Sequence, residues 1–269
     1  MPLPSVTLLL TAARIATFEP LRPLTNASGF FFRRDERLFL VTSRHVFIDV
    51  ANDHRPNRIE LELHTDARNL SLSTTFSMLL YEDGKSAWRQ GRDDGGEVDM
   101  AVLEVDRSAL PADAVFEAFT PAHLQQALGD VEVGSSVLIV GFPLGFHDTL
   151  HHLPVVRQAV IASAFGVRFQ GQGHFLTDGR THRGTSGAPV VMRDEAATAA
   201  GAPLPWKLLG VHSSRIDMAN RDLAQDESLG LNSAWYADML MTLTRPGPAV
   251  PPEPEPEATA VPPATPRQR

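Results

Sequence analysis

The chain has 269 residues, of which 43% are hydrophobic and none is cysteine. The absence of cysteine excludes disulfides, thiolate metal sites and a cysteine nucleophile, so covalent catalysis would use Ser, Thr, Lys or a carboxylate. The formal net charge of −8 argues against general binding to nucleic acids or to anionic membranes.

The two ends of the chain differ in composition from the rest. Leu8, Leu9 and Leu10 are apolar, but no Lys or Arg precedes them, so a secretory signal is not expected here. No stretch reaches transmembrane length, and a cytoplasmic location is expected. Nine of the 21 prolines lie between Pro246 and Pro266. The segment 246–269 is therefore predicted to be a disordered, extended tail, with docking to an unknown partner as the alternative.

The segment 1–245 is expected to hold the folded domain, which reads as short strands separated by turns. Arg58–Thr65 alternates apolar and polar residues, as a half-buried strand does. The other expected strands are Ser28–Arg34, Arg37–Ser43, Val98–Val105, Ser135–Gly141, Val155–Ser163, Ala188–Met192 and Leu208–Val211. Short strands at this density predict an all-β sandwich or a pair of barrels.

Two segments interrupt this pattern. Pro121–Leu128 is predicted to be a short helix that connects two halves of the domain. Asn232–Thr244 places Trp235, Met239 and Leu243 at intervals of four, which predicts a closing C-terminal helix with one apolar face.

The strongest candidate for chemistry is the segment Gly184-Thr185-Ser186-Gly187-Ala188-Pro189-Val190-Val191. A serine nucleophile needs a tight turn that glycine permits, with its Oγ exposed and backbone N–H groups converging on one point. The N–H groups of Gly184 and Ser186 fit that requirement as an oxyanion hole. Small residues before a strand are also typical of an ordinary turn, so the segment alone does not decide.

Two further segments supply the partners that such a serine needs. Phe39-Leu40-Val41-Thr42-Ser43-Arg44-His45-Val46 is an apolar strand that ends in a histidine. Asp99 stands at the start of the apolar strand Val98–Val105, where a carboxylate is costly unless a partner such as imidazole bonds to it. Together, Ser186, His45 and Asp99 provide a nucleophile, a base and an orienting acid.

In this order of His, Asp and Ser, the chain resembles the chymotrypsin-like (trypsin-fold) serine peptidases, and among them the bacterial trypsin-like domains without disulfides. The resemblance covers about residues 5–244. It rests on the segments around His45, Asp99 and Ser186, and on Ser28-Gly29-Phe30, Val140-Gly141-Phe142-Pro143-Leu144-Gly145 and Leu208-Leu209-Gly210-Val211-His212. It implies two antiparallel six-stranded β-barrels, at about 5–115 and 130–230, followed by the closing helix at 232–244.

The resemblance also implies a role for each catalytic candidate. Ser186 would attack a peptide or ester carbonyl, His45 would carry the proton, and Asp99 would orient His45. Ser213 would lie beside them and orient Asp99. The expected function is a serine endopeptidase. The alternatives are a catalytically silent binding module of the same fold and an esterase-like hydrolase with the same triad.

The substrate pocket is expected to involve Thr181, His212, Ser213 and Ser214. Thr181 and His212 resemble pocket residues of viral 3C-type peptidases and of glutamate-specific bacterial peptidases. A hydroxyl and an imidazole N–H both donate to a Gln or Glu side-chain oxygen, which predicts cleavage after those residues. The alternative is that His212 is simply a buried wall residue.

No metal or cofactor is predicted. His147, His151 and His152 have a spacing that can converge on zinc, but a solvated loop after Pro143-Leu144-Gly145 is the preferred interpretation. The acidic stretch from Asp93 to Glu97 lacks the spaced ligands of a calcium loop and is interpreted as a turn. The expected partner is a protein or peptide substrate, without nucleic acid or membrane.

Overall fold

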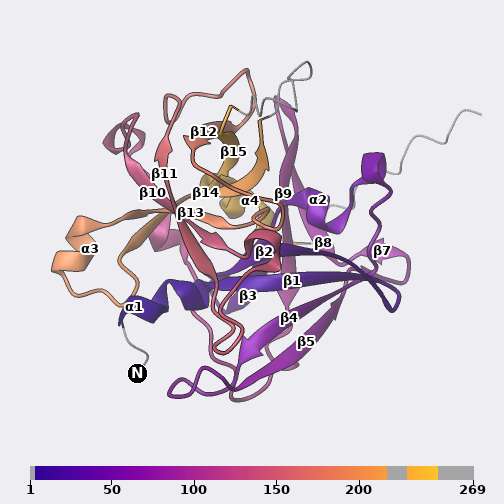
Figure 1. The fold of residues 1–269 in the computed structure, drawn as a ribbon. Coiled ribbons are helices and arrows are strands. Elements are labelled where there is room, and N and C mark those ends of the chain that lie inside the picture. Colours follow the sequence, from indigo (N-terminus) through magenta and orange to yellow (C-terminus); the bar gives the residue numbers. More distant parts are fainter. Residues whose placement is uncertain (1–3, 217–228, 248–269) are drawn as a thin grey trace, which may run out of the picture.

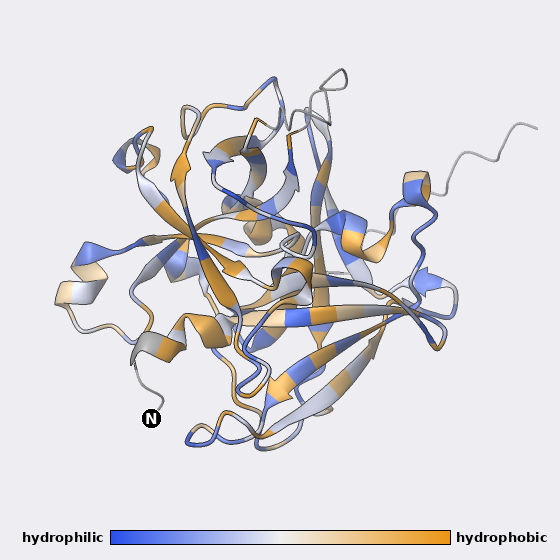
Figure 2. Cartoon of the chain, in the orientation of Figure 1, coloured by the Kyte–Doolittle hydropathy of each residue, from blue (hydrophilic) through white to orange (hydrophobic). Residues whose placement is uncertain are grey.

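The computed structural model describes residues 4–216 and 229–247, so the tail from residue 248 onward lies outside the described residues. The strands form two antiparallel units, with β1 (Ala12–Glu19), β3 (Arg37–Thr42), β4 (Arg58–His64) and β5 (Ser73–Leu79) in the lower part of the view in Figure 1. Hydrophobic and hydrophilic residues alternate along several strands (Figure 2), and along β1 every second residue of the first seven is buried. This alternation is what allows each sheet to cover a core with one face.

The first unit is a seven-stranded sheet. Its order is β5-β4-β1-β2-β3-β9-β8. The strands are β1 (Ala12–Glu19), β2 (Arg22–Arg34), β3 (Arg37–Thr42), β4 (Arg58–His64), β5 (Ser73–Leu79), β8 (Trp88–Asp93) and β9 (Gly96–Val105). A separate hairpin pairs β6 (Tyr81–Glu82) with β7 (Lys85–Ser86).

The second unit is a closed six-stranded barrel in the order β10-β11-β12-β15-β14-β13, which confirms the prediction for this half. The strands are β10 (Ser136–Gly141), β11 (Val155–Ile161), β12 (His174–Asp178), β13 (Pro189–Arg193), β14 (Trp206–Arg215) and β15 (Leu231–Tyr236). A barrel that closes on itself leaves no unpaired edge strand.

The first unit differs from the expected closed six-stranded barrel. It has one strand more, and no ladder among the described strands joins β5 to β8. β5 has the polar sequence Ser-Thr-Thr-Phe-Ser-Met-Leu, and alternate residues such as Thr75 and Ser77 are exposed. Its polar residues suit the solvated edge of an open sheet.

The C-terminal helix is shorter than predicted. Residues 231–236 form β15, and only the 3₁₀ turn Ala237–Met239 and the helix α4 (Leu240–Leu243) are helical. β15 bridges β12 and β14 and so closes the barrel. The ladders on both sides of β15 outweigh the helical spacing of Trp235, and the second barrel extends to residue 236, beyond the expected limit near 230.

The remaining helical segments are short. They are α1 (Pro4–Thr7), α2 (Arg44–Phe47), α3 (Glu195–Ala199) and the 3₁₀ turns Leu9–Thr11, Val50–Asn52, Pro121–His123, Leu128–Asp130 and Pro143–Gly145. The expected connecting helix at 121–128 is thus reduced to separate 3₁₀ turns. In the described part of the chain, no helix has the length and apolarity needed to cross a membrane.

The hydrophobic core has three parts. One lies in each unit, and the third joins residues of both, including Phe30, Val41, Val140, Val191 and Trp235. This shared core fixes the two units against each other and thereby fixes the loops that meet between them.

Candidate active site

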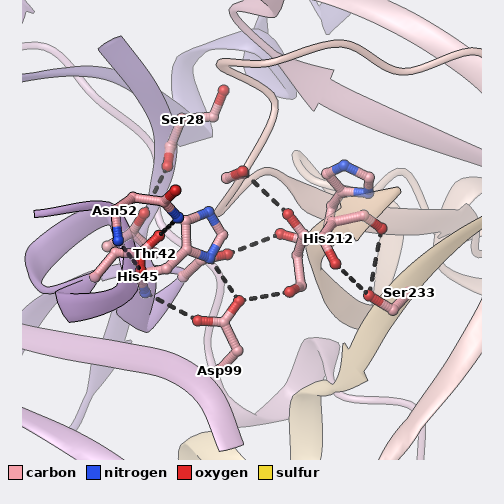
Figure 3. Close-up of polar contacts among 12 residues, drawn as sticks. Ser28, Thr42, His45, Asn52, Asp99, His212 and Ser233 are labelled. Atoms are coloured by element: carbon pink, nitrogen blue, oxygen red, sulfur yellow. Dashed lines mark hydrogen bonds and ion pairs between the residues drawn. The ribbon is translucent and has the colours of Figure 1, made fainter. Parts of the chain in front are cut away.

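The three catalytic candidates come from three different elements that the fold brings together. β3 pairs with β9 as far as Thr42 and Ala101. The chain then turns into α2, which carries His45 and packs against β9 close to Asp99. Ser186 lies in the turn before β13 and belongs to the second unit. The site is therefore built across the two units (Figure 3).

Asp99 is held by three hydrogen bonds. Its Oδ2 accepts from His45 Nδ1 at 2.7 Å and from Ser213 Oγ at 2.5 Å, and its Oδ1 accepts from the His45 backbone N–H at 2.9 Å. With Nδ1–H donating to Asp99, the lone pair of His45 is at Nε2, as a general base requires. The dashed bonds in Figure 3 show this arrangement between His45 and Asp99.

The same contacts shift both ionisation equilibria. Burial opposes the charge on His45, but the hydrogen bond and negative charge of Asp99 outweigh it and raise the pKa of the imidazole above 6.5. Burial also opposes the charge on Asp99, but the bonds from His45 and Ser213 lower the pKa of the carboxyl below 3.8. Asp99 is consequently ionised and His45 is more basic than a free histidine.

The Ser186 hydroxyl is not directed at His45. It donates to the Ser213 carbonyl at 3.0 Å, and no hydrogen bond joins it to His45 in the described structure. A rotation about the Cα–Cβ bond of Ser186 would be needed to redirect Oγ. Catalytic hydrogen bonds of this kind are often long or misaligned until a substrate is bound.

The predicted oxyanion hole has a backbone that only glycine permits. Gly184 has a φ of +87°, and a Cβ there would lie 2.6 Å from the Phe142 carbonyl oxygen. The preceding carbonyl, of Arg183, accepts from the Leu144 N–H at 2.6 Å. Because C=O and N–H point in opposite directions in a trans peptide, this bond turns the Gly184 N–H away from Leu144. Neither Gly184 N–H nor Ser186 N–H donates to another described residue, so both are free to bind an oxyanion.

Ser28 holds this turn in place. Its Oγ donates to the Gly184 carbonyl at 2.7 Å and accepts from the Phe142 N–H at 2.9 Å, and its own N–H donates to the Ser186 carbonyl at 3.0 Å. Sequence reasoning named Ser28 only as part of a supporting motif and did not identify this role. The contacts join residues far apart in the chain, and no local pattern around Ser28 could have shown them.

The predicted pocket residues His212, Ser213 and Ser214 belong to β14, whereas Thr181 lies before the Gly184 turn and bonds to Asn232 of β15. His212 lies in β14, is 2% exposed, and its Nδ1 has no hydrogen-bond partner among the described residues. Burial and the neighbouring His45 lower the pKa of His212 to about 4. Thr181 is buried, but its hydroxyl donates to Asn232 Oδ1 at 2.5 Å. Ser214 is exposed, with its Oγ 3.2 Å from Ser233 Oγ. Sequence reasoning missed Asn232 because the segment Asn232–Thr244 was expected to be a helix.

The two candidate metal segments have different surroundings. Asp93, in the acidic stretch, forms an ion pair with Arg168 at 2.8 Å and accepts from the Gly95 N–H, as a turn residue does. Of the three loop histidines, His151 pairs with Asp148 at 2.8 Å, whereas His147 and His152 face Glu62 of β4.

Comparison with known proteins gives one family match and many structural matches. A family model described as a trypsin-like peptidase domain matches residues 27–204. A solved structure of an HtrA-type protease with a tripeptide matches with a TM-score of 0.54 and 16% sequence identity. The alignment covers 89% of this chain but only 60% of that one, so the chain spans well under the full length of this neighbour. A comparison with curated proteins finds no match.

Proposed function

Since the chain belongs to the family of trypsin-like peptidase domains, we propose that it is a serine endopeptidase with Ser186 as nucleophile, His45 as general base and Asp99 as the orienting acid. The single observation that carries the assignment is the Asp99 carboxylate, fixed between His45 Nδ1 and Ser213 Oγ. A purely structural carboxylate has no need to hold a histidine ring through Nδ1 so that the lone pair stays on Nε2.

The reaction follows from these positions. Ser186 Oγ rotates from the Ser213 carbonyl toward His45 and attacks the substrate carbonyl, while His45 Nε2 accepts its proton. The N–H groups of Gly184 and Ser186 donate to the developing oxyanion. His45 then protonates the leaving amine, and water hydrolyses the acyl-enzyme by the same path in reverse.

Labelling with a fluorophosphonate probe tests the nucleophile. The wild-type protein should be labelled, Ser186→Ala should not, and Ser136→Ala, at an exposed position on β10, should be labelled like the wild type. One observation favours the silent binding module instead, namely the Ser186 hydroxyl bonded to the Ser213 carbonyl. A folded wild-type protein that resists the probe would establish that alternative. Labelling together with turnover of esters but not of peptides would identify the esterase.

The proposed substrates carry Gln or Glu before the scissile bond. His212 Nδ1 is buried and has no hydrogen-bond partner among the described residues, which is unfavourable, and a Gln or Glu side-chain oxygen that reached it would accept a hydrogen bond from the imidazole N–H. His182 is next to Thr181 in the chain. Burial and the nearby positive charges of Arg157, Arg180 and Arg215 lower the pKa of His182, and such positive charges would favour a Glu side chain. Thr181 contributes less than the sequence suggested, because its hydroxyl hydrogen is directed to Asn232.

A peptide library tests this preference. We expect cleavage after Gln or Glu, and we expect His212→Val to lose the preference by at least about tenfold, as for other sites that lose a hydrogen bond to the substrate. A profile dominated by Arg, Lys or large aromatic residues would overturn it. The melting temperature of His212→Val separates a specific loss from misfolding.

A further inference from the structure

A second cluster of chemically active side chains lies outside the proposed triad. His147 and His152 belong to the loop between the turn Pro143–Gly145 and β11, and Glu62 belongs to β4 of the first unit. One ligand atom from each of the three residues lies within 4.8 Å of the other two. The cluster therefore joins the two units at a point that the peptidase mechanism does not use.

The ring of His147 is oriented as a metal ligand would be. Its Nδ1 is 2.6 Å from the Gly145 carbonyl oxygen, which requires Nδ1 to carry the proton and leaves the lone pair on Nε2. Metal-binding histidines generally donate their other N–H to a carbonyl or carboxylate, which fixes both the tautomer and the ring. The His147 and His152 rings face each other with centroids 6.3 Å apart.

His152 is held in a conformation that its sequence does not favour. Its φ is +54°, a left-handed value that is uncommon for a residue other than glycine. Its Nδ1 lies 2.8 Å from Glu62 Oε1, yet this buried atom makes no aligned hydrogen bond to any described residue. An ion pair alone would be expected to align the N–H with the carboxylate. A lone pair that shares a cation with Glu62 explains the contact better.

The carboxylate and the loop are fixed by their surroundings. Glu62 accepts from Ser73 Oγ at 3.0 Å through Oε1 and from Arg14 Nη2 at 3.3 Å through Oε2. The positive charge of Arg14 opposes the binding of a cation. However, Arg14 contacts Oε2 of Glu62, whereas Oε1 is the oxygen that faces His152. His64 also anchors the loop, because its Nε2 donates to the His151 carbonyl at 2.7 Å. These contacts preorganise the three ligands and reduce the entropy lost on binding.

We propose that Glu62, His147 and His152 form a binding site for Zn²⁺, with a fourth position for water or another ligand. Two imidazoles and one carboxylate suit zinc, whereas calcium and magnesium prefer oxygen ligands alone. Zinc bonds of about 2.0–2.2 Å separate neighbouring ligand atoms by roughly 3.5 Å, so small side-chain movements would complete the site. The proposal does not depend on the peptidase function.

The site would restrain the loop that supports the predicted oxyanion hole. Phe142 and Leu144 lie at the start of this loop, beside and within the turn Pro143–Gly145, and their N–H groups donate to Ser28 Oγ and to the Arg183 carbonyl. A metal that pins His147 and His152 to β4 would hold these residues from the other end of the loop. Zinc should therefore slow hydrogen exchange in 142–154 and at the adjoining residues 183–185.

Titration of the Ser186→Ala protein with Co²⁺ tests the site without reference to activity. We expect one equivalent to produce the intense visible absorption of a four-coordinate cobalt ion, and we expect Zn²⁺ to displace it. Glu62→Gln, His147→Gln and His152→Gln should each weaken binding at least about tenfold. His151→Gln is the matched control, since that ring pairs with Asp148 in the same loop, and it should bind like the parent protein.

Three results would overturn the proposal. They are the absence of a cobalt spectrum at millimolar metal, a spectrum that survives in all three ligand variants, and an equal loss in His151→Gln. Circular dichroism of each variant separates lost binding from lost folding, and three independent ligand variants make a common folding failure easy to recognise. None of these outcomes depends on Ser186, so the test of the zinc site is independent of the test of the proposed peptidase function.

Discussion

Replacement of Ser28 by alanine should weaken both the fold and the reaction. Ser28 is fully buried, and its Oγ is the partner of the Gly184 carbonyl and of the Phe142 N–H. The substitution removes one oxygen and leaves two backbone groups without a hydrogen bond. The hydroxyl lies in a tightly packed place, because a Cβ built on Gly141 would lie 2.5 Å from Ser28 Oγ.

The magnitude follows from the two unpaired groups. Each buried backbone group left without a partner costs about 1–3 kcal/mol, so we expect the free energy of unfolding to fall by about 2–6 kcal/mol. The Gly184 carbonyl belongs to the peptide next to the predicted oxyanion donor. A complete loss of such a donor costs a factor of about 10²–10³ in kcat. Partial displacement should lower kcat at least about tenfold while KM changes little.

Urea unfolding and active-site-titrated kinetics measure the two effects. The urea midpoint should fall with an unchanged m value, since the surface exposed on unfolding stays the same. Ser136→Ala is the control, because Ser136 is exposed and its hydroxyl accepts, among the described residues, from the Gln158 side chain. A Ser28→Ala protein within about 0.5 kcal/mol of the wild type, with normal kcat, would refute the reasoning.

Three further predictions concern the same region. Gly187→Ala should lower the free energy of unfolding by more than about 4 kcal/mol or prevent folding, because its Cβ would lie 2.2 Å from the Ser28 carbonyl oxygen. Gly84→Ala is the control, because Gly84 has a similar φ but open space around it, and it should lower the free energy by only about 1 kcal/mol. Thermal or urea unfolding measures both. Activity should fall as the pH drops through the raised pKa of His45, above 6.5, and in Asp99→Asn this acid limb should move to lower pH while kcat falls about 10⁴-fold. The pKa of His212 is about 4, so its imidazole is neutral between pH 8 and pH 6. A bound Glu carboxylate favours the uptake of a proton from solution by His212, whereas a Gln side chain does not, so the ratio of kcat/KM for Glu over Gln should rise at least about tenfold from pH 8 to pH 6. A ratio that does not change with pH would contradict this.

The strands were predictable wherever their own residues carried the pattern. The expected segments Arg58–Thr65 and Val98–Val105 correspond to β4 and β9 within about two residues. β15 was not predictable in this way, because Trp235, Met239 and Leu243 recur at a helical interval and the choice of strand depends on pairing with β12 and β14. Pairing between strands that are distant in the sequence depends on tertiary structure, and the spacing of apolar residues within one segment does not predict it.

In the candidate site, too, the sequence predicted the residues whose own segments carry a pattern and missed the others. His45, Asp99 and Ser186 stand in segments whose composition indicates a strand end, a strand start and a tight turn, and the structure brings His45 and Asp99 into contact. Ser28 and Glu62 could not be found in this way. Each acts on residues of the other unit, and the residues around it form an ordinary strand.

Thr181 was predicted to donate a hydrogen bond to the substrate, but its hydroxyl donates to another side chain of the protein. The sequence suggested that its hydroxyl donates to the substrate, but in the structure that hydrogen is directed to Asn232 Oδ1. Asn232 in turn donates to the carbonyls of Thr177 and Gly179. Thr181→Val should therefore leave the Asn232 oxygen unpaired and lower the free energy of unfolding by about 1–3 kcal/mol.

The same variant distinguishes support of the pocket from contact with the substrate. If His212 is the main donor to the substrate, Thr181→Val should keep the ratio of Gln or Glu cleavage to cleavage after Ala within about threefold, while its melting temperature falls. Thr181→Ser keeps the hydroxyl and should restore most of the stability, although it creates a small cavity. A Thr181→Val protein with normal stability and a lost preference would show that the hydroxyl leaves Asn232 to bind the substrate, and Thr181 rather than His212 would then be the residue that selects it.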